Sequence, residues 1–88
     1  MDQYKEELKN KIIYRASYRG TKEMDIIMIG FVKTLIEKFN INELKKLNEF
    51  VNMDDETLIS IKNEESMVNV SDSILLNIIE NFRKYNIK

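Results

Sequence analysis

Cysteine, histidine, proline and tryptophan are all absent from this 88-residue sequence, and only two glycines are present. Without Cys or His the chain has no thiol nucleophile, no disulfide and no zinc site with sulfur or imidazole ligands. It also lacks the side chain whose ordinary pKa best suits proton transfer near neutral pH. We therefore expect a protein that is not an enzyme, with no catalytic residues and no metal site.

Long hydrophobic runs are missing as well. The longest continuous apolar run, residues 26–29, is far too short to span a bilayer, and the first ten residues mix acids and bases without the apolar core of a signal peptide. A formal net charge of −1 gives no general attraction to nucleic acid or to an anionic membrane. We expect no membrane insertion, no nucleic-acid partner and a cytoplasmic location.

The sequence is instead rich in helix formers, with apolar residues at spacings of three and four, which is typical of an all-α protein. The absence of Pro removes the residue that most strongly breaks helices. A chain of 88 residues is long enough for one domain with one core. We predict a single domain, residues 1–88, folded as a small bundle of about five helices. These helices are expected at about 2–17, 21–39, 40–51, 55–62 and 72–85.

Two polar positions predict where helices begin. Asn40 can cap a helix while Glu43, three residues later, reaches back to the Asn40 backbone, which is a capping box. Phe39 and Leu44 stand on either side of this cap, where a hydrophobic staple is found. Asp54 offers a similar cap before the fourth helix. The chain is therefore expected to turn tightly at both places.

The buried faces of the first two helices follow from the spacing of their apolar residues. In the first helix the residues that return every four positions are Tyr4, Leu8, Ile12 and Ala16. In the second helix Ile26 and Ile29 widen an apolar face that already has the helical spacing. All of these side chains are expected to face the core.

The segment YRASYRGTKEMD, residues 14–25, contains two of the three Arg in a chain whose other eleven cations are Lys. One interpretation is a helix that ends at Gly20, with a surface ion pair between Arg19 and Glu23. The other is a docking site, because the planar guanidinium of Arg holds a carboxylate in fixed orientation and Gly permits close approach of a partner. Composition leaves both interpretations open.

Tyr14 and Tyr18 lie beside the two Arg of this segment. Tyr and Arg are both enriched at protein interfaces. Tyr also packs half-buried against a core with its hydroxyl in water. The sequence favours neither role over the other.

The stretch IIYRASYRGTKEMDIIMIGF, residues 12–31, resembles the FAD assembly factor family of succinate dehydrogenase, which carries an Arg-Gly-x-x-Glu motif between its first two helices. The motif residues are Arg19, Gly20 and Glu23. A later stretch, LNEFVNMDDETLISI, is similar to the family's helix that ends in an Asp pair and leads into a short helix. The resemblance covers about residues 11–62. It continues beyond the motif at Tyr14, Arg15, Ser17, Met24 and Asp25.

This resemblance implies a five-helix assembly chaperone. Its partner would be the flavoprotein subunit of succinate dehydrogenase or, as in some bacteria, of fumarate reductase, and it would promote covalent attachment of FAD to a His of that subunit. FAD would be the cofactor of this client, and the chain itself would hold no cofactor stably. Arg19, Gly20 and Glu23 would contact the client. The same contact surface would include the flanking positions that match the family, namely Tyr14, Arg15 and Asp25.

The chain departs from the family at one position, since members usually carry a Trp in the short fourth helix, about where Ile61 stands here. The main alternative function is a helical adaptor or a small DNA-associated regulator, with the second and third helices forming a helix-turn-helix. The recognition helix would then present Lys45 and Lys46, but also Glu43 and Glu49, and no Arg. A further alternative, a transferase that binds free FAD, finds no Gly-rich phosphate loop in the sequence.

Overall fold

The computed structural model describes residues 3–18, 22–63 and 72–85. These residues form five helices, which are α1 (Gln3–Ser17), α2 (Lys22–Leu35), α3 (Ile41–Val51), α4 (Asp55–Lys62) and α5 (Ser73–Lys84). The described part contains no strand, so the predicted all-α fold is confirmed. None of its helices is long and apolar enough to cross a bilayer.

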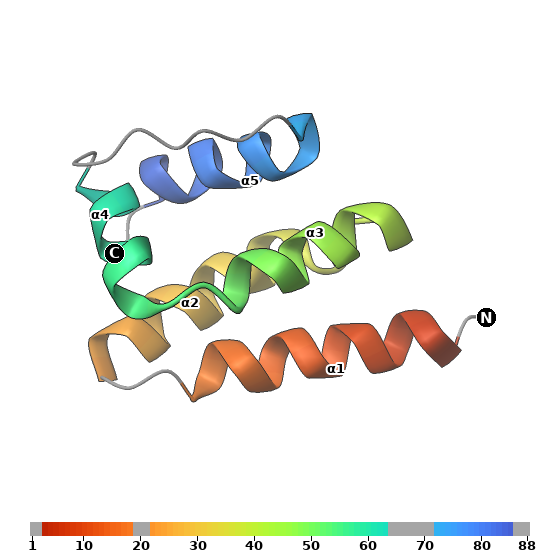
Figure 1. Cartoon of the computed structure of the whole chain (residues 1–88). Coiled ribbons are helices and arrows are strands. Elements are labelled where there is room, and N and C mark those ends of the chain that lie inside the picture. Colours follow the sequence, from red (N-terminus) through yellow and green to blue (C-terminus); the bar gives the residue numbers. More distant parts are fainter. Residues whose placement is uncertain (1–2, 19–21, 64–71, 86–88) are drawn as a thin grey trace.

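Figure 1 shows α1 and α3 lying side by side and running in the same direction, with α2 behind them and α5 on the far side of α3. Helix α1 contacts both α2 and α3, whereas α5 contacts α3 and α4. The short helix α4 lies at the end of the bundle where α3 ends. Helix α3 therefore connects the two halves of the bundle.

Three phenylalanine rings from three different helices meet at the centre of the core. Phe31 of α2, Phe50 of α3 and Phe82 of α5 are each at most 1% exposed. Their ring centroids lie 5.8, 5.2 and 5.1 Å apart, and each pair is arranged edge to face. Such pairs add about 0.5–1.5 kcal/mol to the stability gained by burying the rings. This cluster joins α2, α3 and α5.

Helix α2 is shorter than predicted, because it ends at Leu35 and not near Phe39. The chain continues in a turn in which the Lys38 N–H donates to the Leu35 carbonyl at 3.1 Å. Asn40 then adopts the extended backbone (φ −83°, ψ −179°) that an N-cap residue needs, which is incompatible with a helix running directly into α3. The buried Phe39 stands between this turn and the cap.

The predicted caps are confirmed. The Glu43 N–H donates to Asn40 Oδ1 at 2.9 Å, and the Asn40 N–H donates to Glu43 Oε1 at 2.8 Å, which completes the capping box. At the start of α4 the Thr57 N–H donates to Asp54 Oδ1 at 2.8 Å. These bonds satisfy backbone N–H groups that have no partner inside their helix. They fix the tight turns on both sides of α3.

The ends of α4 and α5 stabilise each other through two cations. The Lys62 ammonium donates to the Phe82 carbonyl at 2.8 Å and to the Tyr85 carbonyl at the end of α5. In return Arg83 Nε donates to the Ile61 carbonyl of α4 at 3.3 Å. Both cations lie at the negative end of a helix dipole. Burial lowers the pKa of Lys62, which is the cost of holding this ammonium against the Phe82 ring.

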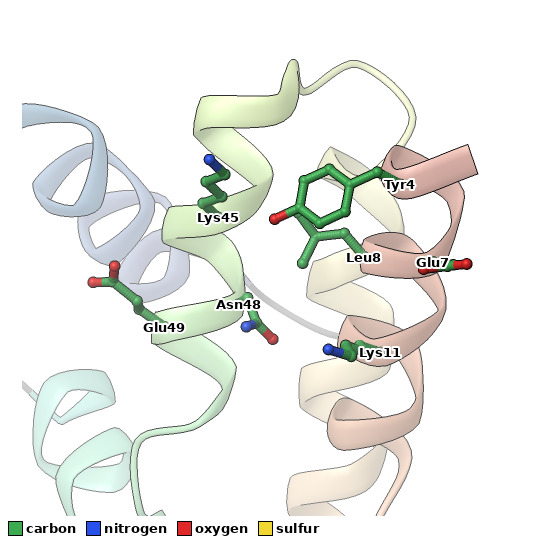
Figure 2. Close-up of a pocket in the computed structure, with 7 residues that line it drawn as sticks. All are labelled: Tyr4, Glu7, Leu8, Lys11, Lys45, Asn48 and Glu49. Carbon is green, nitrogen blue, oxygen red and sulfur yellow. The ribbon is translucent and has the colours of Figure 1, made fainter. Parts of the chain in front are cut away.

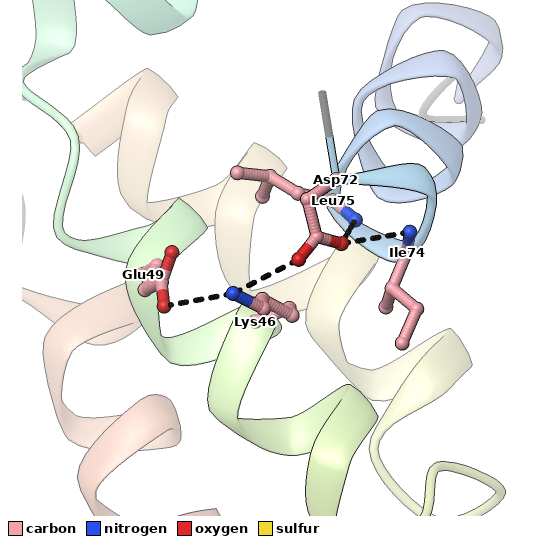
Figure 3. Close-up of polar contacts among 5 residues, drawn as sticks. All are labelled: Lys46, Glu49, Asp72, Ile74 and Leu75. Atoms are coloured by element: carbon pink, nitrogen blue, oxygen red, sulfur yellow. Dashed lines mark hydrogen bonds and ion pairs between the residues drawn. The ribbon is translucent and has the colours of Figure 1, made fainter. Parts of the chain in front are cut away.

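A single carboxylate both begins α5 and ties it to α3 (Figure 3). Asp72 Oδ1 accepts hydrogen bonds from the N–H groups of Ile74 and Leu75 at 2.9 and 3.1 Å, and Asp72 Oδ2 lies 3.0 Å from Lys46 Nζ. The Leu75 N–H, and next the Lys46 ammonium, lower the pKa of Asp72 from its ordinary value of 3.8. Lys46 also lies 3.4 Å from Glu49 on its own helix.

This arrangement predicts an acid-dependent loss of stability. The folded-state pKa of Asp72 is depressed, so its contribution is complete above its ordinary value of 3.8 and is lost as the pH falls through the lower folded-state value. Asp72→Asn keeps the cap but removes the charge. We expect the variant to melt below the wild type at pH 7 and the difference to shrink toward zero as the pH falls to 2. A difference in melting temperature that is constant with pH would contradict this role.

Gly30, in the middle of α2, leaves room for the side chain of Tyr85. A Cβ placed at Gly30 would collide with the Tyr85 hydroxyl, while the next ring atom would be 3.4 Å away. The Tyr85 ring packs edge to face on Phe31 at 5.7 Å, so it cannot withdraw without losing this contact. Nothing in the sequence around Gly30 indicates this long-range constraint.

The effect of Gly30→Ala on the free energy of unfolding should therefore change sign with the residue at position 85. In the wild type the collision should outweigh the gain in helix propensity of about 1 kcal/mol and lower the free energy of unfolding by about 1 kcal/mol. In a Tyr85→Phe background the hydroxyl is gone, so the same change should be neutral or stabilising. Urea unfolding of the four proteins measures this coupling, and equal effects in both backgrounds would refute it.

Candidate functional site

The predicted contact surface lies at the end of the bundle where α1 ends and α2 begins (Figure 1). Tyr14 and Arg15 belong to the last turn of α1, and Glu23 and Asp25 to the first turn of α2. The motif residues Arg19 and Gly20 lie outside the described residues, as does a local Arg19–Glu23 ion pair. The structure therefore describes both flanks of the motif and brings them to one end of the molecule.

The aromatic residues on the α1 side are strongly exposed. Tyr14 is 67% and Tyr18 is 66% exposed, and their ring centroids lie 4.8 Å apart in a tilted pair. A half-buried packing role for either ring is therefore wrong. Tyr4, expected in the buried stripe of α1, is also exposed, by 54%. Exposed Tyr beside the exposed Arg15 is the composition enriched at protein interfaces.

The α2 side contributes a carboxylate and an apolar side chain. Glu23 is exposed in the first turn of α2, where the helix dipole favours a negative charge, and Asp25 is half-buried. Ile26 was expected to widen the buried face, but it is 50% exposed. The prediction is wrong because Ile26 lies two residues from both Met24 and Met28, which places it about 200° around the helix from these buried side chains.

The exposed side chains around the motif form a surface of mixed character, which we call the turn surface. Its described members are Tyr14, Arg15, Tyr18, Glu23 and Ile26. It combines two rings and one aliphatic side chain with a guanidinium and a carboxylate, which suits recognition of another protein. Among the described residues no group of three or more acidic side chains is placed to hold a metal ion. Ile26 was expected to be buried, although its position between Met24 and Met28 could have indicated exposure.

Comparisons with known proteins point to one family. The protein-family model described as "Flavinator of succinate dehydrogenase" matches residues 10–84, which include the whole turn surface and the motif. A curated relative, the mitochondrial succinate dehydrogenase assembly factor 2 of Schizosaccharomyces japonicus, is 33% identical over 45 residues. This match covers 51% of the chain and 32% of the relative's length. No solved structure matches the chain.

The turn surface should be dispensable for folding. Because Tyr14 and Tyr18 are mostly exposed, Tyr14→Ala and Tyr18→Ala should each lower the free energy of unfolding by less than about 1 kcal/mol. As a matched aromatic control, Phe50→Ala removes a ring of the buried cluster and should cost about 3–5 kcal/mol. Chemical denaturation measures all three values, and a loss comparable with that of Phe50→Ala would assign the two Tyr to the core.

Proposed function

Because the chain belongs to the family described as flavinator of succinate dehydrogenase, we propose that it is an assembly chaperone that binds a flavoprotein subunit and promotes covalent attachment of FAD to it. The client is the flavoprotein subunit of succinate dehydrogenase or that of fumarate reductase. The strongest structural support is the exposure of the turn surface on both sides of the Arg-Gly-x-x-Glu motif.

The chain would act by binding and not by chemistry of its own. Its sequence contains no His and no Cys, and its turn surface offers groups that recognise a protein rather than groups that transfer protons near neutral pH. A chaperone that binds one conformation of its client better than others shifts the client toward that conformation. Holding the reacting groups of the client in the right geometry can supply a large part of the rate without a reactive side chain.

FAD would remain with the client throughout. A phosphate cradle commonly uses glycines in a loop that leads into a helix N-terminus. Gly30, the glycine that the structure describes, instead lies inside α2 opposite the Tyr85 hydroxyl. Gly30 therefore does not belong to such a cradle, and no stable cofactor is proposed for this chain.

The motif residues would make the central contacts with the client. Arg19 would form charge-assisted hydrogen bonds through its planar guanidinium. Gly20 would let the client approach the backbone closely. Glu23, exposed at the start of α2, would orient Arg19 or pair with a cation of the client. Tyr14, Arg15 and Asp25 would extend the contact along the two helices.

The alternative of a DNA-associated regulator gains no support from α3. Lys46, one of its two cations, already lies 3.0 Å from Asp72 and 3.4 Å from Glu49. Glu43 is held in the capping box at the start of the helix. A DNA-reading helix needs free donors and cations facing the groove, and of the two cations of α3 Lys46 is used for structure.

Two substitutions test the proposal. Arg19→Ala and Glu23→Ala should each abolish most covalent flavin on the client subunit, because each removes a charged hot-spot group. The melting curve and circular dichroism should stay close to those of the wild type. Glu56→Ala is a matched control, since Glu56 is also an exposed carboxylate in the first turn of a helix, α4. Each variant is mixed with apo flavoprotein and FAD, and the flavin bound covalently to the client subunit is then measured by in-gel fluorescence.

Full flavinylation with either motif variant would contradict the proposed contact. An equal loss with Glu56→Ala would show that the effect comes from helix stability or from net charge, not from the turn surface.

A further inference from the structure

A hollow opens between α1 and α3 (Figure 2). It has a volume of about 330 Å³. Its floor is Leu8, which is only 6% exposed, and every other side chain around it is polar or aromatic. We call it the α1–α3 groove, and it is lined by Tyr4, Glu7, Leu8, Lys11, Lys45, Asn48 and Glu49.

The side chains that face the inside of this groove are hydrogen-bond donors. Figure 2 shows Tyr4, Lys11 and Asn48 directed into the space between the two helices and Lys45 lying along α3 at its upper end, whereas Glu7 and Glu49 extend away from it on opposite sides. A hydroxyl, an ammonium and an amide can all donate to one acceptor. The inside of the groove is therefore suited to a negatively charged group.

The two Lys of the groove differ in their ion pairing from the neighbouring Lys residues on the same helices. Lys9 lies 3.2 Å from Glu37, and Lys46 lies 3.0 Å from Asp72. Within the described part of the chain neither Lys11 nor Lys45 makes an ion pair, and Lys45 Nζ lies 6.0 Å from the centroid of the Tyr4 ring. Both ammonium groups therefore remain available to a ligand.

The groove is continuous with the turn surface. Glu7 and Lys11 also line an adjoining hollow, together with Asn10 and Tyr14, and the Tyr14 ring packs on Tyr18. The exposed side chains thus form one strip along α1, from Tyr4 at its start to Tyr18 at its end. At 1.5 Å per residue this strip is about 20 Å long. A single segment of a protein partner could lie along all of it.

We propose that the α1–α3 groove is a second anchor for the client, and that it holds an Asp or Glu side chain of a client segment that runs along α1 from the motif. This inference rests on the proposed function. Lys11 and Lys45 would supply the charge, and the Asn48 amide and Tyr4 hydroxyl would complete the hydrogen bonds to the carboxylate. A protein segment is favoured over a free anion because the groove opens onto the rest of the strip.

Charge reversal tests the anchor. Lys11→Glu and Lys45→Glu should each weaken binding of the purified client by about tenfold or more, because a like charge would face the client carboxylate. Lys33→Glu, an exposed Lys on α2, is the matched control and should bind within about twofold of the wild type. Calorimetric titration of the client measures the affinity. The wild-type affinity should also fall more steeply with added salt than that of either reversal.

Failure of the anchor is distinguishable from failure of the proposed function. If the wild type binds the client and both reversals bind equally well, the groove is not an anchor, although the chaperone role stands. If the wild type does not bind the client, both proposals fail. Saturable binding of free glutamate to the chain alone, lost in both reversals, would assign the groove to a small carboxylate and overturn the anchor.

The identity of the bound segment can be tested directly. With Tyr4→benzoylphenylalanine the photoreactive ring stands at the mouth of the groove, and irradiation of the complex should link it to one client peptide. Mass spectrometry should place an Asp or Glu within a few residues of the linked position. Linkage to a peptide without an acidic residue nearby would contradict the proposed occupant.

Discussion

The edge-to-face cluster of Phe31, Phe50 and Phe82 is the interaction on which the rest of the bundle depends. It joins α2, α3 and α5 at one point of a core to which all five helices contribute buried side chains. The cations Lys62 and Arg83 then only have to align the ends of α4 and α5. Helix α1 lies outside the ring cluster but packs against both α2 and α3 and so closes the core.

Helix α1 buries one narrow stripe, Leu8, Ile12 and Ala16, and leaves a whole flank to solvent. That flank carries three of the four Tyr of the chain and leads directly to the Arg-Gly-x-x-Glu motif. The stripe packs α1 against α2 and α3, and the exposed flank adds little to this packing. This division lets so small a chain combine one core with a long exposed flank, which the proposed function uses for recognition.

The sequence predicted local features well and long-range features poorly. The caps at Asn40 and Asp54 involve residues three apart, so the sequence alone shows them. Exposure of Ile26 follows from its position about 200° around α2 from Met24 and Met28, so the spacing within α2 also indicates it. The close approach of Tyr85 to Gly30 and the α1–α3 groove both depend on how helices that are far apart in the sequence pack together. For the site, family resemblance supplied the motif, and the structure added the exposure of its flanks.

The central claim, that this chain promotes covalent attachment of FAD to a flavoprotein, is tested most directly by deleting its gene and measuring covalent flavin on the dehydrogenase subunit by in-gel fluorescence. The account predicts a strong loss of subunit fluorescence at unchanged subunit abundance, and recovery when the wild-type gene is returned. Normal subunit fluorescence in the deletion strain, for succinate dehydrogenase and fumarate reductase alike, would contradict it.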